Sequence, residues 1–318
     1  MALNSSGPIS IAGTTSGQSI QIELGGNGTT TMSLNDAAVR TLAEVPSGAI
    51  IMPTNFYGKA NEYAFSISTN QVNANLRSLA VSAGWNQSTK LIATINGGVY
   101  VYSNSTGTPA LTVNGSFPNG VTLINNGYIL GMGGNGGTGC PVGFTSASSG
   151  DSGGIGLSVS SAITINNASG VIAGGGGGGG GGGSYCDGGV GKGGPYIQYG
   201  WAGGGGGGGQ TGLSNSGGGG PGGGTFNQRS RDPQPGSGGD VSGAGSGGIG
   251  AAAPNAGFFA GAGGNGGGWG SSGSGGQGGR GGAFYNGPPG AGGSSGNAIT
   301  GNSNITYINT GTRYGGIS

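Results

Sequence analysis

Glycine limits the folding of this chain more than any other feature of its sequence. It occupies 71 of the 166 positions from 131 to 296, but only 15 of the first 130 positions and four of the last 22. Glycine loses the most backbone entropy when a segment becomes ordered, so a glycine run folds only against a considerable cost. The sequence therefore has a conventional N-terminal part, a glycine-dominated body and a short closing segment.

The glycine body has two competing interpretations. A composition rich in glycine and serine is typical of a flexible linker. Three features favour an ordered body: apolar and aromatic clusters interrupt the glycine runs, the runs have similar lengths, and the chain closes with an apolar strand pattern. The clusters are 196–201, 258–259 and 284–285, and the runs are 174–183, 203–209, 217–224 and 261–268.

An ordered form of polyglycine exists. Extended helices of the polyproline II type have three residues per turn and rise 3.1 Å per residue. When every side chain is a hydrogen, such helices can pack side by side and bond their amides to their neighbours, which satisfies groups that a single helix would leave to water. We therefore predict a bundle of polyglycine II helices, in which a run of eight residues is about 25 Å long.

A short repeat borders the glycine runs. Residues 121–134 and 162–176 share a strand, Asn-Asn, a small-residue step, a second short strand and a glycine run. Residues 298–309 echo the strands, but no glycine run follows them. Each copy is too small to bury its own apolar face, so we expect the copies to stack on one another as the base of the body.

The first 60 residues predict short strands and one helix. Isoleucine and leucine alternate with small or polar residues between 9 and 24, a pattern typical of strands. Ser33 is a candidate N-cap, Asp36 is the acid of a capping box, and Pro46 ends the apolar pattern. These signals predict a helix over 34–43.

Residues 60–117 predict a small β domain. The apolar runs 91–95 and 99–103 flank Asn96-Gly97-Gly98, a strong signal for a β-hairpin. Trp85 and Phe65 are expected to anchor the core of this domain. The fold class is thus mostly β and irregular, with a segment at 1–58, a small β domain with one short helix ahead of it at 59–118, and the strand-repeat base with the polyglycine II body and its distal loops at 119–318.

Composition excludes several classes of function. Nine basic residues spread over 318 cannot form the patch that nucleic acid requires. The chain has no His, which excludes His-based triads, and with only two Cys a zinc site is nearly excluded, so we expect no metal and no cofactor. No stretch of 18 apolar residues predicts a membrane span, and the first residues do not resemble a signal peptide.

Three motifs that look chemical are interpreted as structural. Gly-x-Gly-x-x-Gly, as in 131–136, is expected by chance at this glycine content. Residues 188–193 hint at a phosphate loop, but the Walker spacing would need Gly at 186 and Ser or Thr at 193. A glycosidase needs two carboxylates at a set separation, whereas the acids after residue 62 are interpreted as turn residues. These acids are Asp151, Asp187, Asp232 and Asp240.

Several segments resemble bacteriophage tail proteins. Residues 121–137, with Trp85-Asn86 and 98–102 ahead of them, resemble the C-terminal region of the central tail fibres of lambda-like phages. The glycine body is similar to the distal adhesins of some T-even-like phages, in which loops between polyglycine II helices touch the bacterial receptor. Residues 6–10 and 33–40 resemble the start of many small phage tail proteins. The chain differs from the T-even-like adhesins in having its own β domain ahead of the glycine body.

The resemblance implies a receptor-binding protein at the tip of a phage tail or tail fibre. Its partners would be a receptor on the bacterial outer surface, an outer-membrane protein or a polysaccharide, and other tail proteins attached through the segment 1–58. Because phage fibres are often trimeric, the resemblance favours three chains in the N-terminal part. We expect no enzymatic activity; the alternatives are a depolymerase of surface polysaccharide, marked by acids converging in a groove, and an ice-binding protein with a flat polar face.

The recognition surface is predicted from the direction of the runs. If they alternate from the base, 140–152, 184–202 and 225–235 are distal and 210–216 and 251–260 are basal. Tyr, Trp and Arg dominate binding energetics, and Tyr-rich loops on a rigid frame work as paratopes. The alternative is that these rings cap the edge of the bundle. The predicted receptor-binding residues are Tyr185, Tyr196, Tyr199, Trp201, Phe226, Arg229 and Arg231.

The two cysteines are a candidate disulfide. Cys140 and Cys186 each follow a copy of the repeat and its glycine run, so parallel runs from a shared base would bring both to the same end. A bond closing this 45-residue loop would stabilise the protein by about 4 kcal/mol on the chain-entropy estimate. Two separate buried thiols are the alternative.

Overall fold

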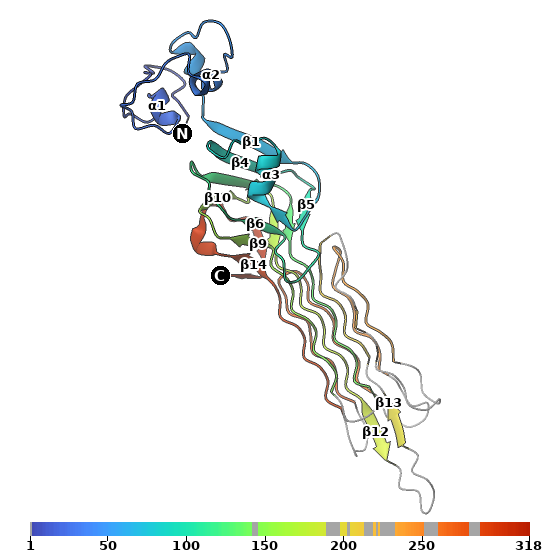
Figure 1. Cartoon of the computed structure of the whole chain (residues 1–318). Coiled ribbons are helices and arrows are strands. Elements are labelled where there is room, and N and C mark those ends of the chain that lie inside the picture. The colour runs from blue at the N-terminus through green and yellow to red at the C-terminus, as the bar shows by residue number, and fades with distance from the viewer. Residues whose placement is uncertain are drawn as a thin grey trace, which may run out of the picture. The chain divides into compact units, whose positions relative to one another are not determined.

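The computed structural model shows two compact units (Figure 1). The first unit comprises Met1–Phe65, Ala80–Ala93 and Ser116–Thr122, and the second comprises Ser66–Leu79, Thr94–Gly115 and Leu123–Ser318. Strands predominate and helices are few, which confirms a mostly β fold. The structure describes residues 2–141, 146–188, 198–201, 204–212, 219–220, 222, 233–250, 260–279 and 287–318.

The first unit has its own small core. Seven buried hydrophobic residues between Leu3 and Phe56 form it, with partly buried side chains such as Ile50 and Met52 packed against them. Its short helices are α1 (Ile20–Glu23), α2 (Ala37–Ala43) and η1 (Thr54–Phe56).

Two sequence expectations for this unit need correction. Strands were expected around Ile20, where the structure has α1, capped by the Ser19 side chain, which accepts from the Ile22 N–H at 3.3 Å. A four-residue helix is too short to show a helical period in the sequence. The expected helix over 34–43 exists but begins at Ala37, with Asp36 as N-cap, and the Asp36 carboxylate accepts from the Ser33 N–H at 2.8 Å.

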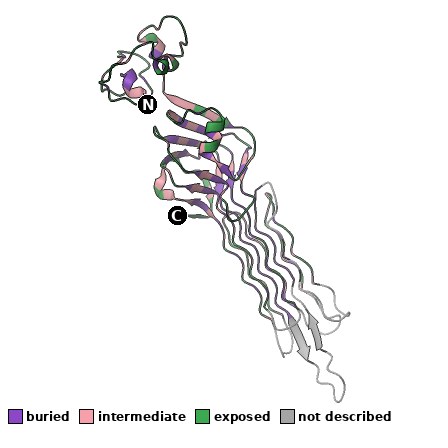
Figure 2. Cartoon of the chain, in the orientation of Figure 1, coloured by how far each residue is buried: buried purple, intermediate pink, exposed green. Residues whose placement is uncertain are grey.

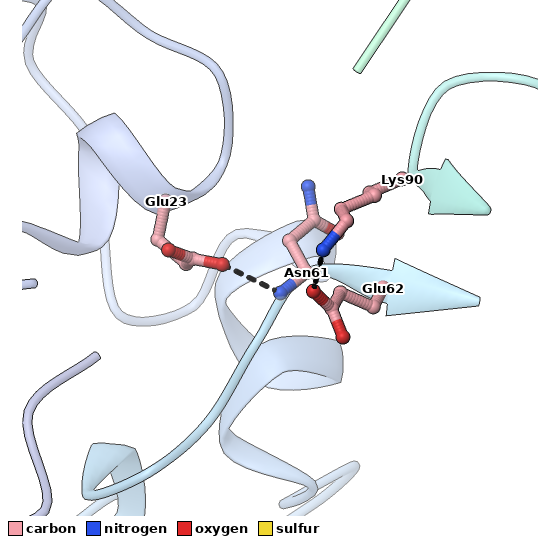
Figure 3. A network of polar contacts seen from close by, with 4 residues as sticks. All are labelled: Glu23, Asn61, Glu62 and Lys90. Atoms are coloured by element: carbon pink, nitrogen blue, oxygen red, sulfur yellow. Dashed lines mark hydrogen bonds and ion pairs between the residues drawn. The ribbon is translucent and has the colours of Figure 1, made fainter. Parts of the chain in front are cut away.

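Polar contacts hold the segment that follows the small core (Figure 3). The Glu23 carboxylate accepts from the backbone N–H of Asn61 at 2.9 Å, and Lys90 pairs with Glu62 at 2.6 Å. Trp85 is 2% exposed and stacks on Phe117 with ring centroids 5.6 Å apart, as expected of a core anchor. The expectation for Phe65 was wrong, because this residue is only half-buried.

Three five-stranded sheets form a three-sided β-helix. The strand orders are β1-β4-β7-β10-β15, β2-β5-β8-β11-β16 and β3-β6-β9-β14-β17. Each coil of the β-helix therefore consists of three successive strands, one in each sheet. The helices α3 (Leu76–Ser82) and η2 (Asn302–Asn304) interrupt the coils. The strands are β1 (Glu62–Ile67), β2 (Gln71–Val72), β3 (Ala74–Asn75), β4 (Lys90–Ile95), β5 (Tyr100–Tyr102), β6 (Leu111–Val113), β7 (Val121–Asn125), β8 (Tyr128–Leu130), β9 (Leu157–Val159), β10 (Ile163–Asn166), β11 (Val171–Ala173), β14 (Asn297–Thr300), β15 (Ile305–Asn309), β16 (Thr312–Tyr314) and β17 (Gly316–Ile317).

Parallel pairing stacks like residues inside the β-helix. Val101 pairs with Ile129 and Ile129 with Ile172, and all three are fully buried. The predicted hairpin is therefore wrong: β4 and β5 are real strands, but they lie in different sheets. The Asn96-Gly97-Gly98 step turns a corner of the β-helix, with Gly98 at φ +77°.

The sequence repeat is the coil of this β-helix. Its Asn-Asn step lies at a corner, where the buried Asn125 side chain donates to that of Asn167 at 2.7 Å, and Asn167 donates to the Thr310 carbonyl at 2.9 Å. The expectation that the copies stack is confirmed for 121–134 and 162–176, because β8 pairs with β11. The third copy, 298–309, does not align as its sequence suggested. Ile163 of the second copy pairs with Ile305 of β15, one strand later in the chain than β14.

The glycine body is inserted into two coils, between β8 and β9 and between β11 and β14. It consists of extended segments, here called rods, that run side by side (Figure 1). Backbone hydrogen bonds join neighbouring rods at every third residue; for example, the N–H groups of Gly131, Gly134 and Gly137 donate to Ala173, Gly176 and Gly179. The described rods are 131–140, 148–154, 174–183, 204–210, 219–220, 234–240, 243–250, 260–268, 271–279 and 287–296.

Two rods form the centre of the body and are buried along their length (Figure 2). Both 174–183 and 204–210 are hydrogen-bonded to, or in direct contact with, six other rods, and both are glycine at every position but Gln210. On outer rods glycine is obligatory only where a neighbour lies: a Cβ on Gly273 or Gly276 would strike the backbone of the central rod, while Gly278 faces open space. The number of glycines per turn thus follows the number of neighbouring rods.

Candidate functional site

The directions of the rods define two ends of the body. Rods 131–140 and 174–183 leave β8 and β11 and run parallel, whereas 148–154 and 204–210 return, because Gly178 and Gly181 donate to Asp151 and Ser148. We call the ends that adjoin the coils the sheet end and the opposite ends the far end (Figure 1).

The sheet end is closed by polar turns. Thr211 contacts Met132 at 3.2 Å, and the indole N–H of Trp269 donates to the Thr211 carbonyl at 3.1 Å. In the turn after rod 234–240, the Asp240 carboxylate accepts from the backbone and hydroxyl of Ser242 and from the Gly243 N–H. The Ser242 hydroxyl is the main cause that lowers the pKa of Asp240 below its ordinary value.

The far end carries a two-stranded antiparallel sheet, β12 (Tyr185–Gly188) and β13 (Gln198–Trp201) (Figure 1). Backbone pairing sets Tyr185 opposite Trp201 and Asp187 opposite Tyr199. The structure therefore brings three predicted binding residues into one hairpin. The other predicted residues, Tyr196, Phe226, Arg229 and Arg231, lie outside the described residues.

Of the segment 251–260, which was expected to be basal, residues 251–259 lie outside the described residues, but the two rods that it links meet it at the far end. Rod 243–250 runs opposite to 204–210, since Gly245 and Gly248 donate to Gly208 and Gly205, so it reaches the far end at Gly250. The next rod starts there, because Gly261 donates to Gly183. Counting runs missed one reversal, the turn at 240–243, whose Asp-x-Ser-Gly sequence is a turn signal.

The aromatic residues of the body concentrate in the chain segments that link rods. Between 131 and 296 the sequence has eleven: Tyr185, Tyr199 and Trp201 lie on the far-end strands β12 and β13, and seven stand outside the described residues, in sequence segments that link rods whose described ends are at the far end. The exception is Trp269 at the sheet end, whose ring lies 6.3 Å from that of Tyr314. Five of these were not assigned to the binding surface from the sequence. The ten are Phe144, Tyr185, Tyr196, Tyr199, Trp201, Phe226, Phe258, Phe259, Phe284 and Tyr285.

Both cysteines also belong to the far end. The Cys140 N–H donates to the Gly182 carbonyl at 2.8 Å, and its buried Sγ lies 3.2 Å from the Ser184 hydroxyl. Cys186 follows two residues later on β12, paired through its backbone with Gly200. The disulfide stays a prediction. Within the described ranges, no group of three His, Cys, Asp or Glu residues could hold a metal ion, and no helix is long and apolar enough to cross a membrane.

Comparison with known proteins identifies the family. Residues 62–318 match the family model described as phage tail fibre adhesin Gp38. No curated protein matches the chain. A crystal structure of the gp37–gp38 adhesin tip complex of the bacteriophage S16 long tail fibre is similar: its matching chain is 24% identical, with 97% of this chain and 100% of that chain covered and a TM-score of 0.48. The chain belongs to the Gp38 family of phage tail fibre adhesins.

Proposed function

We propose that this adhesin recognises its bacterial receptor with the segments at the far end of the rods. As a member of its family it is a receptor-binding protein at the tail-fibre tip of the virion, and other phage tail proteins are its partners. The observation that carries the proposal is the sequence position of the aromatic residues: of the eleven between 131 and 296, three lie on β12 and β13 and seven stand in segments that link rods ending at the far end. Aromatic residues concentrated in the connecting segments of so polar a chain indicate an interaction site.

The rods supply the rigid frame that such a site needs, and we propose that they are polyglycine II helices. Their backbone bonds recur at every third residue, which matches three residues per turn. Neighbouring backbones also approach so closely that a Cβ on Gly178 would overlap the Asn135 carbonyl. A frame in which each turn is bonded to its neighbours holds its end segments in place, which lowers the entropy lost on binding.

We propose that binding, not catalysis, is the whole activity of the far end. A depolymerase needs converging carboxylates. The Asp240 carboxylate lies at the sheet end, β12 with Asp187 lies at the far end, and the Asp151 carboxylate accepts from the Asn135 amide at 3.0 Å along a rod. These separate places support a structural role for the three acids.

We further propose that residues 1–58 attach the adhesin to the tail. The small core between Leu3 and Phe56 lies wholly outside the matched range, which begins at residue 62. A segment that folds around its own core, outside the part shared with the family, fits a separate task such as attachment.

The far-end site is tested by the variant Tyr199→Ala, Trp201→Ala, Arg229→Ala. We expect adsorption of purified protein to host cells to be abolished, because anchors of these types carry most of the energy of an interface. The melting temperature should stay within a few degrees of the wild type.

A matched control is the variant Thr306→Ala, Thr310→Ala, Thr312→Ala, which changes three exposed residues of the last coil. It should adsorb like the wild type. Full adsorption by the aromatic variant, or loss of its fold, would place the recognition surface elsewhere.

A further inference from the structure

The backbone bonds between rods do not by themselves fix how far one rod lies along the next. Residues 260–279, two rods and the turn that joins them, are here called the rod hairpin. Their bonds to neighbours recur at every third residue; for example, the N–H groups of Gly264 and Gly267 donate to successive turns of the central rod 174–183. A chain moved by three residues along this path would form the same bonds with other glycines. Side chains must therefore set the register.

The glycine pattern of the rod hairpin excludes one such shift at a single position. If each residue took the place of the residue three positions earlier, Trp269 would take the place of Gly266. A Cβ there would lie 1.8 Å from the Gly208 carbonyl oxygen. Seven other places are just as crowded, and each would receive another glycine. The eight crowded places, where a Cβ would lie 2.1 Å or less from a backbone atom, are Gly261, Gly263, Gly264, Gly266, Gly267, Gly270, Gly273 and Gly276.

The opposite shift is excluded at the other end of the first rod. If each residue took the place of the residue three positions later, Ala260 would enter the place of Gly263. A Cβ there would lie 1.9 Å from the Gly205 carbonyl oxygen. Phe258 would enter the place of Gly261, which is equally crowded. Residues with side chains therefore bracket a rod that is otherwise free to slide by whole turns.

Specific contacts hold Trp269 where it stands. Its backbone N–H donates to the side-chain oxygen of Gln210 at 3.1 Å, and its indole N–H donates to the Thr211 carbonyl at 3.1 Å. Its ring lies 6.3 Å from that of Tyr314 on β16. The next residue, Gly270, has φ +64°, and a Cβ on it would lie 2.2 Å from the Tyr314 carbonyl carbon. The turn of the rod hairpin is thus fixed both to the end of a central rod and to the last coil.

We propose that Trp269 is a positioning residue, the register stop of the rod hairpin. A side chain of any size at this position excludes the shifted register, and the contacts of the indole hold the native one. Glycine alone cannot specify the register, because successive turns of a glycine rod are alike. The two rods end at Ala260 and Gly279, so the stop also sets the level at which their far-end segments join the body. This role does not depend on what those segments bind.

Two substitutions separate a register stop from ordinary packing. Trp269→Gly removes the indole contacts and the obstacle together, whereas Trp269→Ala removes the contacts but keeps a Cβ. Amide NMR of the full-length protein labelled with ¹⁵N at glutamine reads the register through Gln277, whose N–H donates to the Ala262 carbonyl at 2.8 Å. We expect one Gln277 signal in the wild type and in Trp269→Ala, and a second signal in Trp269→Gly. Gln71 on β2, the internal control, should give one signal in all three proteins.

Melting temperatures complete the test. Trp269→Gly and Trp269→Ala should both melt a few degrees below the wild type, because both lose the indole contacts. Trp269→Ser, which also keeps a Cβ, should show one Gln277 signal as Trp269→Ala does. A single, unshifted Gln277 signal in Trp269→Gly would overturn the proposal. A second Gln277 signal in Trp269→Ala or Trp269→Ser would overturn it as well, even if Trp269→Gly failed to fold.

Discussion

At the scale of single residues, whether a rod position requires glycine depends on the neighbouring rods. A Cβ on Gly276 would lie 2.6 Å from the carbonyl carbon of Gly181 and 2.9 Å from the Gly182 nitrogen, closer than Cβ atoms pack. Two residues along the same rod, Gly278 has no heavy atom within 4 Å of its Cβ position. The sequence shows two identical residues, and only the neighbouring rods make one of them irreplaceable.

We therefore expect Gly276→Ala to destabilise the body by at least about 1–3 kcal/mol, because a packed backbone cannot move aside for a methyl group. Gly206→Val, on a central rod where a Cβ would lie 2.9 Å from the Gly180 carbonyl, should be worse. Gly278→Ala, the matched control, should be neutral or slightly stabilising, since it lowers the entropy of the unfolded chain. Thermal melting checks all three; equal melting of Gly276→Ala and Gly278→Ala would contradict close packing.

At the scale of elements, the last coil of the β-helix ends with a charge. The buried stack Val101, Ile129, Ile172 continues in register to Arg313 on β16. Side chains in register on parallel strands share a face, so Arg313 takes an inward position. Its guanidinium lies 5.2 Å from the Tyr307 ring centroid. An inward charge on an edge strand is a known device against edge-to-edge association.

Arg313→Val should therefore promote association through the last coil. It removes a cation–π contact of about 0.5–1 kcal/mol and extends the apolar stack to an unpaired edge. Light scattering should show concentration-dependent oligomers for this variant, and none beyond the wild-type state for Arg313→Lys, which keeps the cation. If the molar mass of Arg313→Val stayed equal to that of the wild type at high protein concentration, the charge of Arg313 would not be what prevents association at this edge.

Local signals located elements but not their partners. The runs at 91–95 and 99–103 predicted β4 and β5 correctly, yet Asn96-Gly97-Gly98 suits a hairpin and a β-helix corner equally, and only pairing with distant strands decides between them. In the same way, residue types predicted a binding surface rich in Tyr and Trp, and the hairpin of β12 and β13 unites three of those residues. The directions of the rods on either side of 251–260 were not predicted, because the direction of a rod depends on every turn before it.

At the scale of the whole molecule, the coils of the β-helix pair their strands independently of the rods inserted into them. In the second unit, the glycine body is two insertions into coils whose strands still pair, as Leu157 of β9 does with Ile299 of β14. The coils therefore close without any contribution from the sequence of the rods. Such an arrangement allows the sequences of the far-end segments to change while the coils stay the same.

The stability of the protein should depend little on pH between 5 and 8. The chain has no His and only 17 charged residues, so few groups titrate in this range. The described carboxylate with a resolved shift is Asp240, whose pKa is lowered from 3.8, first by the Ser242 hydroxyl. A lowered pKa in the folded state means that the contribution of Asp240 to the stability of the protein is fully present above pH 3.8 and is lost as the pH falls through the folded value.

Calorimetry should give a constant melting temperature from pH 5 to 8 and a decline only below about pH 4. Asp240→Asn keeps an oxygen acceptor in the turn and should weaken the decline of the melting temperature at acid pH. A melting temperature that falls steeply between pH 8 and 5 would contradict this prediction, because it would require a titrating group that the sequence does not provide.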